Sequence, residues 1–143
     1  DGRLGGFREE VKALTDGRGA DVIYDPVGGD VFDESMRCVA VDGRILPIGF
    51  TSGRWPQAPV NLILIKQVSV IGVRAGEYGR LYPEKGSENR RAIYELAASG
   101  QIHPYVSAGF ELSEAVAAMR MLEERNVVGK CVVTMNGYEV PAG

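Results

Sequence analysis

Residues 21–76 read DVIYDPVGGDVFDESMRCVAVDGRILPIGFTSGRWPQAPVNLILIKQVSVIGVRAG, and this stretch decides the fold. It holds three short apolar runs, VIYD, RILPI and VSVI, and a glycine-containing turn follows each of them. A helix-like segment separates the first two runs. This order is typical of a doubly wound parallel sheet in a three-layer α/β/α domain. Such sheets bind ligands at the carboxyl ends of their strands, so the stretch predicts part of a nucleotide site.

Apolar periodicity extends the α/β pattern along the whole chain. Helices are expected over residues 7–14, 30–41, 87–99 and 113–122, and strands over 21–25, 44–50, 68–73, 105–110 and 130–135. We expect Asp30 and Ser87 to cap two of these helices. In the helix over residues 30–41, Phe32, Met36 and Val39 are expected to face inward. Residues 61–65 fit either a helical turn capped by Asn61 or a strand, and residues 76–86 are expected to form a loop.

Prolines and glycines mark the irregular positions of the predicted elements. Pro47 removes one hydrogen bond from the strand over residues 44–50, so we expect a local irregularity or a sheet edge there. Asn136 and Gly137 are expected to form a turn after the last strand.

Length and composition indicate a single globular domain. The chain has 143 residues, 45% of them hydrophobic and 24% charged, with a net charge of −3. At this length a domain buries roughly 68–70% of the surface of its unfolded chain. This net negative charge does not suggest binding to nucleic acid. No apolar run approaches the roughly 18 residues of a membrane span. The first ten residues, DGRLGGFREE, lack the apolar core of a signal peptide.

Residues that commonly bind metals are few. Cys38 and Cys131 are far apart in the sequence and neither belongs to a C-x-x-C pair, while His103 is the only histidine. A zinc site would need all three to converge, so we expect no metal site and two reduced, mostly buried thiols. Free thiols fit a reducing compartment, and therefore a cytoplasmic protein.

Glycines that follow the predicted strands are the first candidates for ligand contact. Gly28, Gly29, Gly49 and Gly72 would line one edge of the sheet. A residue without Cβ lets the backbone approach a flat cofactor, such as a nicotinamide nucleotide, closely. Turn glycines that only reverse the chain explain the same pattern. The sequence contains no G-x-G-x-x-G turn, which is the usual grip on a pyrophosphate.

The sequence contains no known catalytic motif. It has no G-x-S-x-G, H-E-x-x-H, kinase or Walker A pattern. His103 has no acidic, serine or cysteine neighbour and is expected to be structural or on the surface. Asp25 could act as an acid or base, but an Asp beside proline and two glycines is more often a turn residue. We therefore assign no catalytic residue.

Four segments make the sequence resemble a known superfamily. They are GRGADVIYDPVGGDVF, DGRILPIGFTSG, PVNLILIKQVSVIGV and GKCVVTM, and their order and spacing match over residues 7–135. The chain resembles the quinone oxidoreductase (zeta-crystallin-like) branch of the medium-chain dehydrogenase/reductase superfamily, whose zinc-dependent relatives are zinc-binding alcohol dehydrogenases. The resemblance implies a partial Rossmann fold: the C-terminal part of an NAD(P)-binding domain over residues 1–143.

Eight residues are assigned to the cofactor by this resemblance: Val27, Gly28, Gly29, Gly49, Phe50, Val73, Arg74 and Arg125. Residues 27–29 would lie beside the ribose, and residues 49–50 would border the nicotinamide. Residues 73–74 would meet the nicotinamide amide or ribose, and Arg125 would approach from the C-terminal segment. The implied cofactor is NADPH, with NADH as the alternative, and no metal is implied in this part of the family's sequence.

The resemblance also implies an activity and partners. Family members transfer a hydride from NADPH to a quinone, enone or related carbonyl acceptor, and an enoyl-thioester reductase is the alternative within the superfamily. Residues 105–110 and 130–135 would return toward a GroES-like catalytic domain, and we expect them to be unpaired strands in this chain. The strand over residues 68–73 would form a homodimer through its edge. Since the phosphate turn is missing, a non-catalytic dimerisation fragment with little nucleotide binding is a third interpretation.

Overall fold

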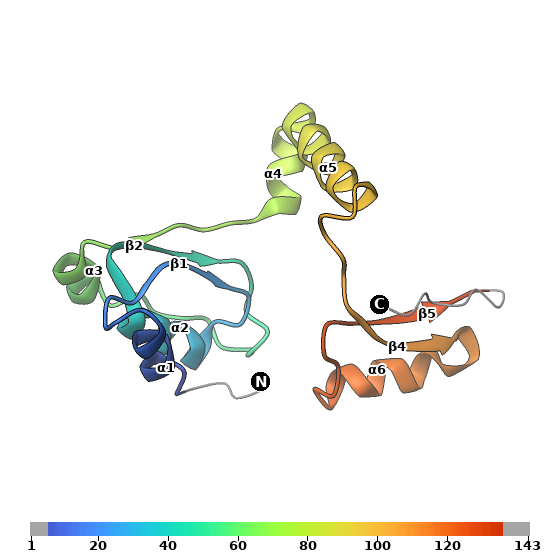
Figure 1. Cartoon of the computed structure of the whole chain (residues 1–143), viewed down its shortest axis with the longest axis horizontal. Coiled ribbons are helices and arrows are strands. Elements are labelled where there is room, and N and C mark those ends of the chain that lie inside the picture. The colour runs from blue at the N-terminus through green and yellow to red at the C-terminus, as the bar shows by residue number, and fades with distance from the viewer. Residues whose placement is uncertain (1–5, 136–143) are drawn as a thin grey trace. The chain divides into compact units, whose positions relative to one another are not determined.

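The computed structural model describes residues 6–135, and the chain divides into two units, residues 1–78 and 79–143 (Figure 1). The first unit contains α1 (Arg8–Leu14), β1 (Ala20–Asp25), α2 (Gly29–Cys38), β2 (Val39–Pro47), α3 (Val60–Lys66) and β3 (Ser69–Val70). Helix α4 (Ala75–Leu81) spans the division. The second unit contains α5 (Pro83–Ala98), β4 (Val106–Glu111), the 3-10 turn η1 (Leu112–Glu114), α6 (Ala115–Glu123) and β5 (Lys130–Thr134). The turn predicted at residues 136–137 lies outside the described residues.

The sheet of the first unit is parallel and has the strand order β1-β2-β3. This confirms the predicted α/β class with a parallel sheet. Pro47 lies in the central strand, not at a sheet edge, and it is the last residue of β2, opposite Asp25. The next N–H, that of Ile48, donates to the Asp25 carbonyl at 2.8 Å, so the pairing of the two strands continues past the proline.

One face of α2 and the centre of the sheet form the core of the first unit. Phe32 and Met36 are four residues apart on α2, and each is only 1% exposed. They pack in one cluster with Ile45, which is fully buried on β2. The predicted inward positions of Phe32 and Met36 are confirmed, and burying side chains of this size contributes about 1.5–3 kcal/mol each.

Helix α2 begins and ends differently from the prediction. Gly28, with φ 69° and ψ −157°, stands before the helix, and Asp30 lies in its first turn instead of capping it. There its carboxylate complements the positive end of the helix dipole. The helix ends at Cys38, not at residue 41, because Val39 turns to extended backbone (φ −65°, ψ 139°) and starts β2. Val39 is buried as predicted, but in a strand.

The predicted loop over residues 76–86 is wrong. Residues 75–81 form α4, and α5 begins at Pro83, so Ser87 lies inside a helix and caps nothing. Proline suits the first turn of a helix, where its missing N–H has no partner to lose. A Cβ on Gly86 would lie 2.7 Å from the Gly79 Cα, so these glycines permit a close helix–helix approach instead of a loop.

Three other boundaries also differ from the sequence prediction. Residues 61–65 form a helix, α3, and Pro59 instead of Asn61 stands at its N-cap position. Strand β2 covers residues 39–47, where residues 44–50 were expected. Only residues 69–70 of the expected strand over 68–73 form β3, although the N–H groups of Ile71 and Val73 still bond to the β2 carbonyls of Ile45 and Pro47 at 2.9 and 3.1 Å.

The second unit contains a parallel pair of strands with a helix between them in sequence. β4 pairs with β5 from Val106 opposite Lys130 to Glu111 opposite Thr134. The expectation that these strands would be unpaired is therefore wrong, because they bond to each other. Ala118 of α6 is buried, 3% exposed, and Cys131 of β5 has its Sγ 4.0 Å from the Ala118 carbonyl.

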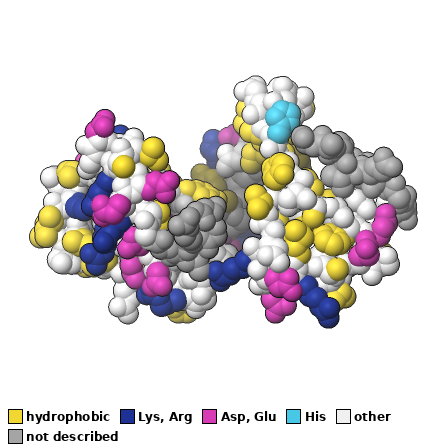
Figure 2. Space-filling view, turned by 60° about the horizontal axis from the view of Figure 1, so that its bottom comes forward, with side chains coloured by type: hydrophobic (Ala, Val, Ile, Leu, Met, Phe, Trp, Pro, Cys, Tyr) yellow, Lys and Arg dark blue, Asp and Glu magenta, His cyan; other side chains and the backbone are white. Residues whose placement is uncertain are grey.

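Large apolar side chains remain exposed in both units (Figure 2). They include Val22, Tyr24 and Val41 of the sheet, Leu64 and Ile65 of α3, Ile93 and Tyr94 of α5, and Val116 and Met119 of α6. Within residues 6–135 no helix has both the length and the apolar character needed to cross a membrane.

Candidate functional site

The carboxyl ends of β1, β2 and β3 meet at one edge of the sheet, because parallel strands all point the same way. β1 ends at Asp25 opposite Pro47, the end of β2, and the Val73 N–H after β3 donates to the Pro47 carbonyl at 3.1 Å. Residues 27–29, 49–50 and 73–74 therefore leave the sheet from the same edge. Seven of the eight residues predicted to bind a cofactor follow these strand ends.

Asp25 holds the turn that follows β1. Its side chain is 1% exposed, and its Oδ1 accepts the N–H groups of Val27 and Gly28, both at 2.9 Å. Asp side chains commonly stabilise turns in this way. The other carboxylate oxygen, Oδ2, is also buried and has no hydrogen-bond partner among the described residues. The sequence left two roles open for Asp25, a turn residue or an acid or base. The geometry supports the turn role.

The loop after β2 lies along this turn. We call residues 48–54 the β2 loop. The N–H groups of Thr51 and Ser52 donate to the carbonyls of Pro26 and Val27, at 3.2 and 3.0 Å. The Thr51 Oγ1 also donates to the Pro26 carbonyl at 3.3 Å. Two segments that are far apart in sequence are therefore joined into one backbone surface at the edge of the sheet.

The glycines of the turn are required by this close packing. Gly28 and Gly29 both have positive φ, 69° and 54°. A Cβ on Gly28 would lie 2.9 Å from Phe50 Cδ1, and one on Gly29 would lie 2.8 Å from Ser52 Oγ. The turn interpretation therefore explains both glycines without a ligand, and their contact with a cofactor stays a prediction. Gly72 has nothing within 4 Å of its Cβ position.

An arginine that the sequence did not single out fixes the far end of the β2 loop. Arg54 Nη2 lies 2.7 Å from Asp30 Oδ1 and 2.7 Å from Asp33 Oδ2, both on α2. The hydrogen bonds that Arg54 donates to the Asp33 and Asp30 carboxylates raise the pKa of Arg54. Asp30 and Asp33 are three residues apart and share one helix face. The spacing of the two carboxylates is visible in the sequence. No sequence pattern indicates that the cation which binds them is Arg54, 21 positions after Asp33.

Three further residues predicted to bind the cofactor lie in different parts of the structure. Phe50 is 44% exposed in the β2 loop, and the Arg74 carbonyl accepts the Tyr78 N–H at the start of α4, at 2.9 Å. Arg125 lies in the second unit just after α6, with φ 58°, and its N–H donates to the Leu122 carbonyl at 3.1 Å. Its approach to the other seven residues stays a prediction.

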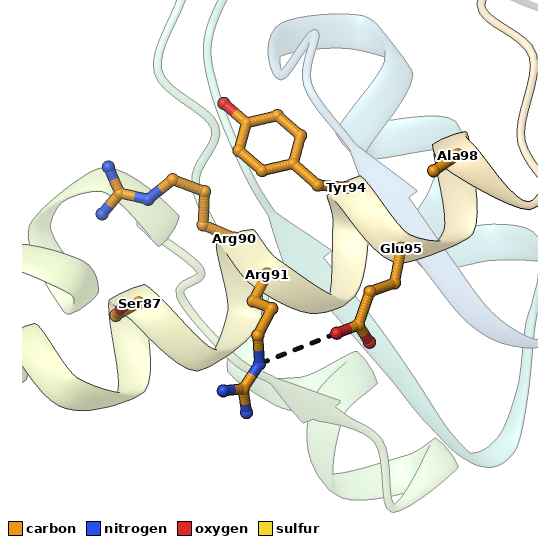
Figure 3. A pocket seen from close by; sticks show the side chains of 6 residues that line it. All are labelled: Ser87, Arg90, Arg91, Tyr94, Glu95 and Ala98. Carbon is orange, nitrogen blue, oxygen red and sulfur yellow. Dashed lines mark ion pairs between the residues drawn. The ribbon is translucent and has the colours of Figure 1, made fainter.

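A separate hollow of about 460 Å³ runs along α5 (Figure 3). Ser87, Arg90, Arg91, Tyr94, Glu95 and Ala98 line it. All six come from one helix, and the Arg91 Nε lies 3.8 Å from Glu95 Oε1. None of the eight predicted cofactor residues lines this hollow, so it is not the predicted site.

Metal-ligating side chains are scattered in the described part of the chain. Among residues 6–135, no group of three or more His, Cys, Asp or Glu side chains is arranged to hold a metal ion. Cys38 belongs to the first unit, whereas His103 and Cys131 belong to the second. Burial raises the pKa of the Cys38 thiol, which disfavours the thiolate that metals bind. These residues do not fit a zinc ion, and we derive no chemistry from one.

Known proteins with similar sequences or structures agree with the fold. A relative from Nematostella vectensis, the quinone oxidoreductase-like protein 2 homolog, is 39% identical over 128 residues, 89% of this chain and 35% of its own length. The structure of mycobacterial Rv1454c complexed with NADPH matches with a TM-score of 0.77 and 27% identity, over 93% of this chain and 41% of that one. The CurK enoyl reductase shares the fold, with a TM-score of 0.73 at 23% identity, over 94% of this chain and 40% of that one.

The family follows from a match over most of the chain. The model of the family described as "Zinc-binding dehydrogenase" matches residues 1–133. The chain spans little more than a third of the length of the curated relatives that it matches, 35% for the Nematostella protein and 38% for a bovine one. The chain therefore belongs to the zinc-binding dehydrogenase family, within the medium-chain dehydrogenase/reductase superfamily, as its sequence predicts.

Proposed function

We propose that this chain supplies the nicotinamide side of an NADPH site in an oxidoreductase that transfers a hydride to a quinone or a related enone or carbonyl acceptor. The observation that carries the proposal is the edge where the three parallel strands end, since ligands of open α/β sheets bind outside the carboxyl ends of strands. Similarity to a quinone oxidoreductase-like protein and to a structure complexed with NADPH supports the choice of chemistry.

In this proposal the chain binds and orients, and the cofactor supplies the hydride. Residues 27–29 contribute backbone beside the nicotinamide ribose, and the half-exposed Phe50 ring provides an apolar wall for the nicotinamide. Val73 and Arg74 meet the carboxamide or ribose, and the family resemblance adds Arg125, a residue of the second unit, to the proposed cofactor contacts. No side chain of this chain is assigned a proton-transfer step.

We also propose the domain arrangement and the partners that the family implies. Residues 1–143 form the C-terminal part of the Rossmann domain, and residues 105–110 and 130–135 return toward a GroES-like catalytic domain. A homodimer forms through the outer edge of residues 68–73. A cytoplasmic location belongs to the same proposal, supported by the free thiols of Cys38 and Cys131.

A calorimetric titration tests which half of the cofactor the chain recognises. The ligands are NADPH, reduced nicotinamide mononucleotide and adenosine 2′,5′-bisphosphate. We expect weak binding of NADPH, because the glycine-rich phosphate turn that holds its pyrophosphate is not in this sequence. We expect similarly weak binding of the mononucleotide, which has no pyrophosphate to lose. We expect no binding of the adenosine compound. Micromolar affinity for it would contradict the proposal, and heat from none of the three ligands would favour a non-catalytic dimerisation fragment.

The enoyl-thioester reductase alternative shares this cofactor site, and the fold of the CurK enoyl reductase favours keeping it. The two activities differ only in the acceptor. An NADPH-oxidation assay with quinone and enoyl-thioester acceptors, run on a protein that contains this chain together with a GroES-like domain, separates them. Turnover of the enoyl thioester alone would overturn the quinone assignment.

A further inference from the structure

Resting on the function proposed above, we infer that Arg54 is a positioning residue for the nicotinamide side of the site. It latches the β2 loop, which carries Phe50, onto helix α2, whose N-terminus follows the Gly28-Gly29 turn. The latch is a single guanidinium nitrogen that bonds two carboxylates on α2, each at 2.7 Å.

Arg54 lies over the glycine turn as well as beside the helix. A Cβ on Gly28 would lie 3.2 Å from the Arg54 carbonyl oxygen, and one on Gly29 would lie 3.5 Å from the Arg54 Nε. Main chain and side chain of this residue therefore border the segment proposed to lie beside the ribose. A shift of Arg54 would be transmitted directly to the turn.

Backbone hydrogen bonds already attach the β2 loop to the turn after β1, and the Arg54 latch adds to this attachment. Thr51 and Ser52 bond to the carbonyls of Pro26 and Val27, and the Arg54 N–H bonds to Ser52 Oγ at 3.3 Å. The Arg54 side chain then joins the loop to helix α2 itself. Its partners Asp33 and Asp30 precede it in the sequence by 21 and 24 positions. Phe50 belongs to this attached segment, so its ring position depends on how firmly the loop is held.

Because its ion pairs are exposed, Arg54 contributes more to the position of the β2 loop than to the stability of the whole unit. The side chains of Arg54, Asp30 and Asp33 are 49%, 83% and 48% exposed. Ion pairs at such exposure contribute little to the stability of a whole domain. They are sufficient to favour the state in which the β2 loop is attached to helix α2 over the state in which it is released. Salt weakens these ion pairs.

Amide hydrogen exchange of the 143-residue chain tests the latch. Arg54→Ala should speed exchange at Thr51 and Ser52 about two- to ten-fold, the size expected for losing exposed ion pairs. Arg54→Lys should restore part of the protection, and Asp33→Asn should reproduce part of the loss. Arg18→Ala is the matched control, because it removes an exposed Arg–Asp pair with Asp21, away from the β2 loop. Unchanged exchange in Arg54→Ala would overturn the latch.

Binding of reduced nicotinamide mononucleotide tests the positioning role. Its dissociation constant, followed by the fluorescence of Trp55, should rise about two- to ten-fold in Arg54→Ala and recover partly in Arg54→Lys. Trp55 is the only tryptophan, 80% exposed and adjacent to Arg54. Faster exchange with unchanged affinity would overturn the positioning role. An unaltered chain that binds no nicotinamide nucleotide would overturn the proposed function, and the positioning role with it.

Discussion

At the residue scale, the turn after β1 is determined by stereochemistry. Asp25 accepts two backbone N–H groups, and Gly28 adopts φ 69° and ψ −157°, a region occupied almost only by glycine. Both features follow from the sequence DPVGG, which predicted a turn here. What the sequence did not predict is the partner: the glycines face the β2 loop, because two turns are packed against each other.

We expect Gly28→Ala to lower the free energy of unfolding by about 2–5 kcal/mol, from backbone strain together with crowding against Phe50. Gly53→Ala is the control: its φ is 78°, but nothing lies within 4 Å of its Cβ position. That variant should lose only about 1–2 kcal/mol. Urea unfolding of both measures the difference. Equal losses would show that the β2 loop does not crowd the turn.

Cys38 gives a pH-dependent prediction. Burial raises the pKa of its thiol above the ordinary value of 9.0, so the folded state holds the proton more tightly than the unfolded state. The resulting stabilisation is complete below pH 9.0 and is lost as the pH rises through the folded-state pKa. The unfolding free energy of the unaltered protein minus that of Cys38→Ala should be constant below pH 9.0 and fall above it. A difference that rises above this pH would contradict the assigned burial.

At the scale of elements, helical and strand periodicity predicted the core of the first unit but not every boundary. Phe32 and Met36 face the sheet as their spacing indicates. The boundary between α2 and β2 was missed because no turn separates them, so Val39 continues the apolar pattern of the helix into the strand. Residues 76–86 were missed because their glycines suggest a loop, whereas Gly79 and Gly86 lie at a close contact of α4 and α5.

Buried and exposed positions of β2 should respond differently to truncation. Ile45→Ala removes a fully buried side chain from the core and should lower the free energy of unfolding by about 2–5 kcal/mol. Val41→Ala, on a residue that is 65% exposed, should change it by less than about 1 kcal/mol. Both are measured by urea unfolding. A large loss for Val41→Ala would mean that something covers this part of the sheet in solution.

At the scale of the whole molecule, the fold class and the family were predictable from the four matching segments, and the arrangement of the site was predictable in part. Strand order follows from chain order and parallel pairing, so residues 27–29, 49–50 and 73–74 were expected at one edge. The Arg54 latch was not predictable, because which cation reaches Asp30 and Asp33 depends on the path of the β2 loop. Arg125 belongs to the other unit, and its role stays a prediction.

The proposed homodimer depends on the outer edge of β3. The Ile71 and Val73 N–H groups point to β2, so the alternation of backbone groups directs the Gly72 N–H to the opposite side. We expect the chain and Gly72→Ala, which keeps this N–H, to sediment as dimers, and Gly72→Pro, which removes it, to sediment as a monomer. Analytical ultracentrifugation measures this. A monomeric unaltered chain, or a dimeric Gly72→Pro, would contradict pairing through this edge.

The central claim is that the carboxyl edge of the β1-β2-β3 sheet binds the nicotinamide half of the cofactor. The most direct measurement is a map of backbone amide shifts as reduced nicotinamide mononucleotide is added. Shifts should concentrate at residues 27–29, 49–50 and 73–74, and adenosine 2′,5′-bisphosphate at the same concentration should cause none there. Shifts confined to the hollow along α5, or the same shifts with both ligands, would contradict the claim.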